Sequence, residues 1–301
     1  MQKKDNFKVI GYYASWSGQP DDLTFQGLTH INFSFAIPAK NGNILQPIDE
    51  LGKLRRLVEL GHQKGVKIFL AIGGWDIEDG GGVDTRFHKI AEKAENRSIF
   101  VKNIMEIVKN YELDGIDMDW EYPDENSTSA DDYLALMKQL SEQLHTQNKQ
   151  LSAAVVAYGS KGFGIKKEVF EAVDWLNIMA YDDDNGIKTK PHSPFSLAEK
   201  SLNYWIKERG LAPEKAILGL PFYGKPYEKN ISNDYKDLLA RGANPALDSL
   251  KNVFYNGTET IKNKTILAKK QGCGGVMIWE ITGDSKDSTS LIRAINEVKS
   301  F

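Results

Sequence analysis

The chain has 301 residues, a formal net charge of −3 and 41% hydrophobic residues, a composition typical of a globular protein with a sizeable core. A slightly acidic chain argues against a nucleic-acid partner, because binding phosphates normally needs a basic surface. The single cysteine, Cys273, excludes an intramolecular disulfide and a cysteine-based zinc cluster.

The chain contains no apolar run of the roughly 18 residues that cross a bilayer, so we expect no membrane span. Its first residues, MQKKDNFKV, lack the apolar stretch of a signal peptide. This pattern fits a cytoplasmic protein, and it equally fits an exported protein whose leader has been removed.

Eight short apolar runs follow one another along the chain, each with the β-branched composition of a buried strand. They begin at Phe7, His30, Lys67, Leu113, Leu151, Trp175, Ala216 and Gly274. Most gaps between them show helical spacing, over residues 51–64, 96–111, 130–145, 196–209 and 260–270. A last helix is expected over residues 287–300, packed beside the first.

Continuous apolar strands that alternate with amphipathic helices predict a parallel sheet covered on its outer side. Eight such units joined by right-handed crossovers predict an α/β fold, a closed (β/α)8 TIM barrel that occupies residues 1–301 as a single domain. A doubly wound open sheet is the alternative. No repeat, linker or low-complexity segment marks a second domain.

The fourth apolar run carries the residues with the clearest chemistry, in the sequence DGIDMDWEYP over residues 114–123. Asp117, Asp119 and Glu121 occupy alternate positions, so their side chains share one face of the strand, which should be the barrel interior. Three ionised carboxylates placed so closely would repel one another, and at least one should hold a proton. Glu121 is the best candidate for this general acid, because active sites of such barrels open at the C-terminal ends of the strands.

Two other interpretations of these acids are a solvated strand edge and a divalent-metal site. The first disagrees with Ile116, Met118 and Trp120, which make the opposite face of the strand apolar as well. The second would need further oxygen ligands or histidines, and the five histidines show no paired spacing. We therefore expect no metal and no other cofactor.

These residues resemble the DxxDxDxE signature of family 18 glycoside hydrolases, the chitinases and their relatives, carried here by Asp114, Asp117, Asp119 and Glu121. The resemblance covers nearly the whole chain. Further segments similar to that family are GYY at 11–13, INFSF at 31–35, AIGGW at 71–75, MAYD at 179–182, GLPFYG at 219–224 and GVMIW at 275–279.

The resemblance implies a chitinase-like hydrolase that cleaves β-1,4-linked N-acetylglucosamine by a retaining, substrate-assisted mechanism. The N-acetyl carbonyl of the substrate attacks the anomeric carbon while Glu121 protonates the leaving oxygen and then acts as base. Asp119 would orient the acetamido group, and Asp117 would share a proton with Asp119. The expected partners are chitin or N-acetylglucosamine oligosaccharides, and we expect a monomer that is secreted or held in the cell envelope.

The resemblance also implies a set of sugar contacts. Tyr181, counted with the catalytic residues, and Asp182 would hold the acetamido group from the other side, and Trp279 would form the floor under the sugar. The substrate-binding residues are Tyr12, Phe35, Trp75, Tyr122, Met179, Asp182 and Trp279. Non-prolyl cis peptide bonds are expected at Ser34–Phe35 and Trp279–Glu280.

The chain departs from the family pattern at two places. Ala71 stands where many chitinases have a serine that supports the deep aspartate, which leaves the pH optimum open. Residues 225–273 must hold the seventh helix, so too little chain remains for the small α/β domain of larger chitinases. We therefore predict a shallow, open cleft and endo-acting, non-processive cleavage. The alternatives are an endo-β-N-acetylglucosaminidase acting on N-glycan cores and a non-catalytic chitin-binding lectin.

Overall fold

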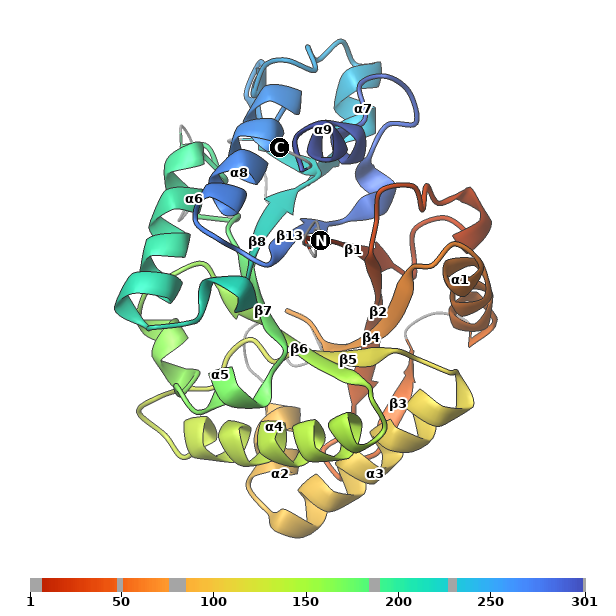
Figure 1. Ribbon diagram of the computed structural model, residues 1–301, viewed down its shortest axis with the longest axis vertical. Helices are drawn as coiled ribbons and strands as arrows, with labels where there is room; N and C mark the ends of the chain where they lie inside the picture. The colour runs from red at the N-terminus through yellow and green to blue at the C-terminus, as the bar shows by residue number, and fades with distance from the viewer. Residues whose placement is uncertain (1–6, 48–50, 76–84, 184–189, 227–231, 300–301) are drawn as a thin grey trace, which may run out of the picture.

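A closed ring of eight parallel strands forms the centre of the molecule, surrounded by helices (Figure 1). The computed structural model describes residues 7–47, 51–75, 85–183, 190–226 and 232–299. In ring order the strands are β1 (Lys8–Ala14), β2 (His30–Pro38), β4 (Lys67–Gly73), β5 (Gly115–Asp119), β6 (Gln150–Val156), β7 (Trp175–Met179), β8 (Ala216–Pro221) and β13 (Gly275–Trp279). Because β1 pairs with both β2 and β13, the ring closes. The predicted barrel is confirmed and the open sheet is wrong.

The register of β5 places its acids between two neighbours. Asp117 lies opposite Ala71 on β4 and Ser152 on β6, and Asp119 lies opposite Gly73. All five residues of β5 are buried, as expected for a strand with apolar residues on one face and a filled barrel on the other.

The helices cover the outside of the ring and mostly begin and end close to the predicted limits. They are α1 (Leu51–Gln63), α2 (Thr85–Ala91), α3 (Ala94–Asn110), α4 (Ser129–Thr146), α5 (Val169–Ala172), α6 (Phe195–Leu202), α7 (Tyr235–Ala240), α8 (Thr258–Lys270) and α9 (Leu291–Val298). The helix predicted over 196–209 is α6 followed by a stretch of π-helix, Asn203–Glu208.

The last helix differs most from the prediction. It begins at Leu291 because Ser290 caps it through the N–H of Arg293, while Asp284 accepts the N–H groups of Leu291 and Ile292. It packs against α8 and not beside α1, so the expected neighbour was wrong (Figure 1).

The chain between β8 and α8 contains more structure than one helix. Four short strands form a small antiparallel sheet in the order β10 (Asn233–Asp234), β9 (Tyr223–Pro226), β12 (Val253–Phe254) and β11 (Ser249–Leu250). A further short strand, β3 (Ile44–Pro47), pairs with the end of β2 in the antiparallel direction. The strands of the small antiparallel sheet have two to four residues each. Helix α7, with six residues, packs against β9 and β10.

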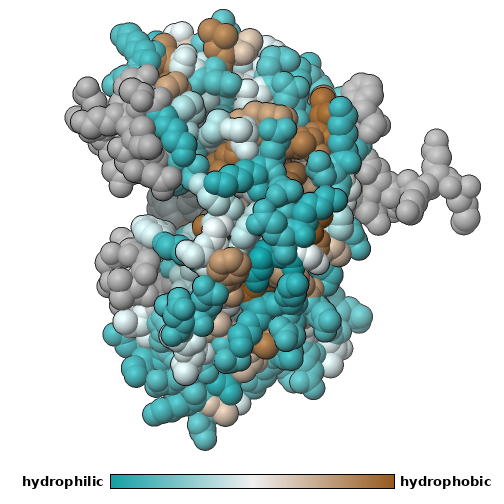
Figure 2. Space-filling view, turned by 90° about the vertical axis from the view of Figure 1, so that its left-hand side faces the viewer, coloured by the Kyte–Doolittle hydropathy of each residue, from teal (hydrophilic) through white to brown (hydrophobic). Residues whose placement is uncertain are grey.

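The face of the molecule drawn in Figure 2 is mostly hydrophilic. Figure 2, which looks onto the left-hand side of Figure 1, shows scattered apolar residues among polar ones. Within the described ranges, no helix has both the length and the apolar character needed to cross a membrane.

Candidate active site

Asp117 lies at the bottom of the candidate site, fully buried in the middle of β5. Its Oδ2 accepts a hydrogen bond from the Tyr12 hydroxyl at 2.5 Å, and its Oδ1 accepts from Ser152 Oγ at 2.5 Å and Asn177 Nδ2 at 3.0 Å. Burial raises the pKa of Asp117, although hydrogen bonds from Ser152, Tyr12, Asn177 and Asn32 oppose this shift. Donors from three other strands, β1, β6 and β7, thus fix this carboxyl in place.

Glu121 lies above Asp117, two residues beyond the end of β5, and its side chain is 7% exposed. Burial raises the pKa of Glu121 to about 7, against the lowering effect of hydrogen bonds with Tyr122 and Asp119 and of the Lys161 charge. Near neutral pH, Glu121 can therefore still hold a proton that it can donate.

Asp119 lies between these two acids along the strand and is 3% exposed. It hydrogen-bonds with Glu121. A proton shared between Asp117 and Asp119 stays a prediction. The structure does bring the three acids predicted from the alternating pattern to one side of β5.

Tyr181 lies two residues beyond the end of β7, close enough to these acids to be affected by their charges. Burial is the main cause that raises the pKa of its hydroxyl, and the charges of Asp119, Asp182, Glu121 and Asp117 add to it. The hydroxyl lies 3.9 Å from the Met277 sulfur, a weak acceptor, so it keeps most of its donor capacity for a ligand.

Asp182 has a left-handed backbone, with φ of 59°, and its Oδ1 collects three polar groups. The Tyr223 hydroxyl lies at 2.7 Å, Lys225 Nζ at 2.9 Å and His192 Nδ1 at 3.3 Å. Burial raises the pKa of Asp182, but His192, Lys225 and Tyr223 outweigh it and lower the pKa to about 2. Asp182 is therefore ionised throughout the neutral range. Met179, the last residue of β7, is partly buried against the core.

Aromatic rings line one side of the site. Trp279, at the end of β13, stacks on Phe35 with ring centroids 5.6 Å apart and meets Tyr12 edge-on at 5.7 Å. Trp16, which is 52% exposed, extends this set with its ring 6.1 Å from Phe35. Such a row of apolar rings can hold the apolar faces of successive sugars.

A second aromatic pair lies beside Glu121. The rings of Trp75 and Tyr122 are 6.5 Å apart, and Trp75 is 51% exposed. The Lys161 ammonium lies over both rings, 5.3 Å from Trp75 and 5.1 Å from Tyr122, in cation–π geometry.

Three non-prolyl peptide bonds around the site are cis. Two are the predicted bonds, Ser34–Phe35 and Trp279–Glu280, and this prediction is confirmed. The third, Glu121–Tyr122, was not foreseen.

Several residues of the site were missed in the sequence. Ser152 and Asn177 are isolated polar residues within apolar strand runs, and this isolation is a signal that could have identified them. Asn32 alternates with the polar residues His30 and Ser34, which marks one face of its strand. Trp16 and His192 lie in loops, Lys161 in a short 3-10 helix, and Tyr223 and Lys225 in the short strand β9. None of these segments is long enough for a period to predict the direction of a side chain.

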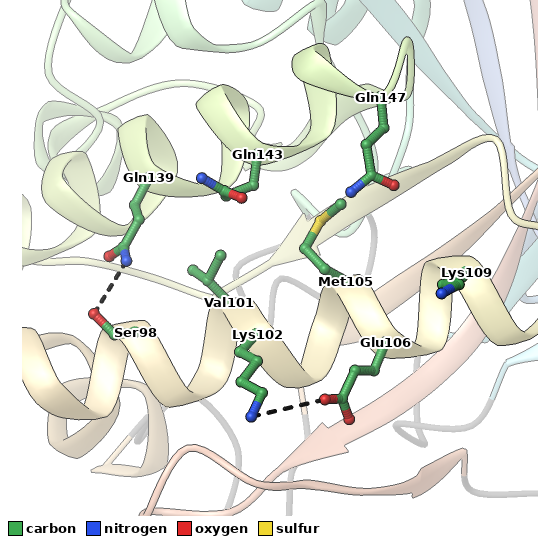
Figure 3. A pocket seen from close by; sticks show the side chains of 9 residues that line it. All are labelled: Ser98, Val101, Lys102, Met105, Glu106, Lys109, Gln139, Gln143 and Gln147. Carbon is green, nitrogen blue, oxygen red and sulfur yellow. Dashed lines mark hydrogen bonds and ion pairs between the residues drawn. The ribbon is translucent and has the colours of Figure 1, made fainter.

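A separate groove of about 340 Å³ lies on the outer helical layer between α3 and α4 (Figure 3). Gln139, Gln143 and Gln147 line one side of it, and Lys102, Met105 and Glu106 line the other. It contains none of the acids predicted for catalysis. Over the part of the chain that the structure describes, no three His, Cys, Asp or Glu side chains are grouped as metal ligands.

A closed parallel barrel with a buried, protonatable carboxyl at its strand ends and aromatic rings beside it has the architecture of a barrel glycoside hydrolase. The family model of the glycosyl hydrolases family 18 matches residues 8–284, so the chain belongs to that family. The resemblance found in the sequence is thereby confirmed.

Individual relatives agree with this assignment. Endochitinase 1 of Metarhizium robertsii (strain ARSEF 23 / ATCC MYA-3075) is 27% identical over 93% of the chain and 82% of its own length. The chain also matches Probable chitinase 10 of Drosophila melanogaster at 26% identity, but it spans only 16% of that protein.

Solved structures show the same fold. The chitinase ChiB from the chitin utilization locus of Flavobacterium johnsoniae superposes with a TM-score of 0.86 at 28% identity, covering 97% of this chain and 94% of that one. A chitinase from Bacteroides thetaiotaomicron gives 0.85 at 26% identity, covering 97% and 96%.

Proposed function

We propose that this glycoside hydrolase cleaves β-1,4 linkages between N-acetylglucosamine units of chitin or its oligosaccharides, with Glu121 as acid and base. The observation that carries the proposal is the burial of Glu121 just beyond the end of β5, which raises its pKa to about 7. The relatives named above are chitinases, and this supports chitin as the substrate.

In the first step, Glu121 donates its proton to the glycosidic oxygen as the bond from that oxygen to the anomeric carbon breaks. The acetamido oxygen of the same sugar forms a bond to the anomeric carbon, giving a cyclic oxazolinium ion and no covalent link to the enzyme. The ionised Glu121 then takes a proton from a water molecule. This water attacks the same carbon, reopens the ring and leaves a product with retained configuration.

Asp119 and Tyr181 would act on the acetamido group. A carboxylate at Asp119 can accept the acetamido N–H and stabilise the positive charge that develops on the ring. The Tyr181 hydroxyl, which lies 3.9 Å from the weakly accepting Met277 sulfur, can donate to the acetamido oxygen and align it for attack. Asp117, held by hydrogen bonds from other strands, supports Asp119 from below.

We also propose that the enzyme works as a monomer outside the cytoplasm. On polymeric chitin, we propose that it cuts linkages within the chain. The location and the monomeric state are expectations that follow from the family assignment. The internal cutting rests on the open cleft predicted from the short connection between β8 and α8.

The experiment digests chitin oligosaccharides of four to six sugar units and, in parallel, an N-glycopeptide. NMR follows the anomeric configuration of the products. We expect the β-anomer of shorter oligomers from chitin and no cleavage of the glycopeptide. Glu121→Gln should lower kcat at least a hundredfold, since it removes the proton donor. Glu280→Gln is a matched control, because Glu280 is a partly buried glutamate just after a strand end, and its carboxylate accepts hydrogen bonds from the N–H and the hydroxyl of Thr282.

Three outcomes would contradict the proposal. Unchanged hydrolysis by Glu121→Gln would exclude this residue as the acid. Cleavage of the glycopeptide alone would instead support an endo-β-N-acetylglucosaminidase, and tight binding of chitin oligomers without any turnover would support a lectin.

A further inference from the structure

A lysine lies fully buried behind the candidate site. Lys264 extends from α8 and its side chain has no solvent exposure. Its ammonium donates to Ser193 O at 2.8 Å, to Ser193 Oγ at 2.7 Å and to Asn256 Oδ1 at 2.6 Å. All three of its protons are thus used, and each acceptor is neutral.

Burial of this charge is costly. Burial lowers the pKa of Lys264 to about 7, against an opposing effect of the Asp248 charge. Among the residues that the structure describes, no carboxylate forms an ion pair with Lys264. A cation kept in such a place needs a benefit that offsets its desolvation.

The hydrogen bonds of Lys264 have a direction. The Ala180 carbonyl oxygen can only accept, so Ser193 must turn its hydroxyl proton toward it and accept from Lys264. The Ala180 oxygen lies 2.7 Å from Ser193 Oγ. Asn256 is oriented in the same way, with Oδ1 toward the lysine and Nδ2 toward Ser193 O at 2.9 Å.

The hydrogen bond from Ser193 to the Ala180 carbonyl is important for the site because Ala180 directly precedes Tyr181. The Ala180–Tyr181 peptide is held on both sides, by Ser193 Oγ at its carbonyl and by Met179 O, which accepts the Tyr181 N–H at 2.9 Å. Just after Asp182, the Asp183 N–H donates to His192 O at 3.0 Å. Residues 192 and 193 therefore bracket the two site residues Tyr181 and Asp182.

We propose that Lys264 is a positioning residue, which through Ser193 sets the peptide between Ala180 and Tyr181 and so places the Tyr181 hydroxyl for catalysis. The inference rests on the proposed hydrolysis of N-acetylglucosamine linkages. Lys264 does not touch the substrate, and its effect on the rate passes through Tyr181.

The test is a set of double-mutant cycles on chitin oligomer hydrolysis. Ser193→Ala and Lys264→Met should each lower kcat by about tenfold to a hundredfold, the effect of a small misplacement of a reacting partner. With Tyr181→Phe already present, the same substitutions should lower kcat less than twofold, because the hydroxyl that they misplace is gone. Lys264→Arg should recover part of the loss, since it keeps a buried cationic donor.

Lys215 gives a matched control. Its ammonium also donates to two backbone carbonyls, of Phe170 and Val173, each at 2.7 Å, but it lies just before β8, at the opposite end of the barrel from the site. Lys215→Met should lower the melting temperature and leave kcat unchanged. Ser193→Ala keeps the lysine and two of its acceptors, so it tests the inference even if Lys264→Met does not fold.

The inference is overturned if both substitutions lower kcat by the same factor with and without the Tyr181 hydroxyl, or if folded variants keep the full kcat. A second readout separates it from the proposed function. In protein labelled with 3-fluorotyrosine, the 19F signal that Tyr181→Phe removes should shift in Ser193→Ala and Lys264→Met and stay in place in Lys215→Met. If the wild-type protein hydrolyses none of the substrates, the proposed function fails. Independently of activity, an unchanged 19F signal of Tyr181 in Ser193→Ala and Lys264→Met would overturn the positioning role.

Discussion

Glu121 must hold its proton when the glycosidic bond breaks, so the pKa of this one side chain should set the upper pH limit of activity. With the pKa raised by burial to about 7, kcat/KM of the free enzyme should fall as the pH rises through that value. Lys161 lowers this pKa by its charge. We expect Lys161→Met to move the basic limb of the profile to higher pH, most clearly at low salt. A basic limb that stays in place or moves to lower pH would contradict this assignment.

Ionisation of Glu121 should also change the free energy of unfolding. The pKa of Glu121 is raised from its ordinary value of 4.5 to about 7, so the folded state binds this proton more tightly than the unfolded state does. Ionisation therefore costs stability as the pH rises from 4.5 to 7, on the order of 3 kcal/mol in total. The free energy of unfolding of Glu121→Gln, minus that of the wild type, should increase over this range and level off above it.

Denaturant titrations at several pH values measure this difference. Glu297 offers a control of opposite sign, because Lys262 lowers the pKa of this exposed carboxylate. Its favourable contribution is present above the unfolded pKa and is lost as the pH falls through the folded one. Glu297→Gln should therefore lose stability relative to the wild type as the pH rises through that acidic range. A flat difference for Glu121→Gln would show that its carboxyl is not desolvated in the folded protein.

At the scale of elements, the close approach of β4 and β5 fixes the strand that carries the acids. Gly73 has φ of +114°, and a Cβ there would lie 2.2 Å from the backbone oxygen of Asp119. Gly73→Ala should lower the free energy of unfolding by about 3 kcal/mol, through backbone strain together with displacement of β5. It should also lower kcat/KM, because β5 leads directly to Glu121.

Gly65 separates these two causes. It has φ of +70° but no atom within 4 Å of an added Cβ, so Gly65→Ala should cost only about 1 kcal/mol and leave kcat/KM unchanged. Thermal unfolding and initial rates measure both effects. Equal losses in the two variants would mean that backbone strain alone, and not the contact with β5, explains the cost at Gly73.

Elements were predictable to the extent that a repeating pattern marks them. The apolar runs locate all eight barrel strands, and α3 and α4 begin and end within two residues of the predicted limits. The start of α9 was not foreseen, because Asp284 caps it from seven residues upstream. The small sheet after β8 was missed for a similar reason, since strands of two residues have no measurable period.

At the scale of the whole molecule, barrel closure assembles the site from distant parts of the chain. Tyr12 and Asn177 are 165 residues apart, yet they hydrogen-bond to each other and both to Asp117. The alternation along β5 predicted which acids share a face, but the register between strands decides which neighbours reach them. That register depends on packing around the full ring, so Ser152 and Asn177 could be suspected as polar residues in apolar runs but not paired with Asp117.

The shape of the whole molecule leads to a last prediction, about how a polymer is cut. Trp16 and Trp75 are the tryptophans of the described chain that are more than half exposed, and the chain after β8 adds only a small sheet. A groove with few exposed rings holds a sliding polymer weakly, so the enzyme should release it after each cut. Soluble chitosan with high acetyl content should shorten steeply while few reducing ends appear, as measured by size-exclusion chromatography. Release of mainly dimers at constant polymer size would show processive cleavage and contradict the open cleft.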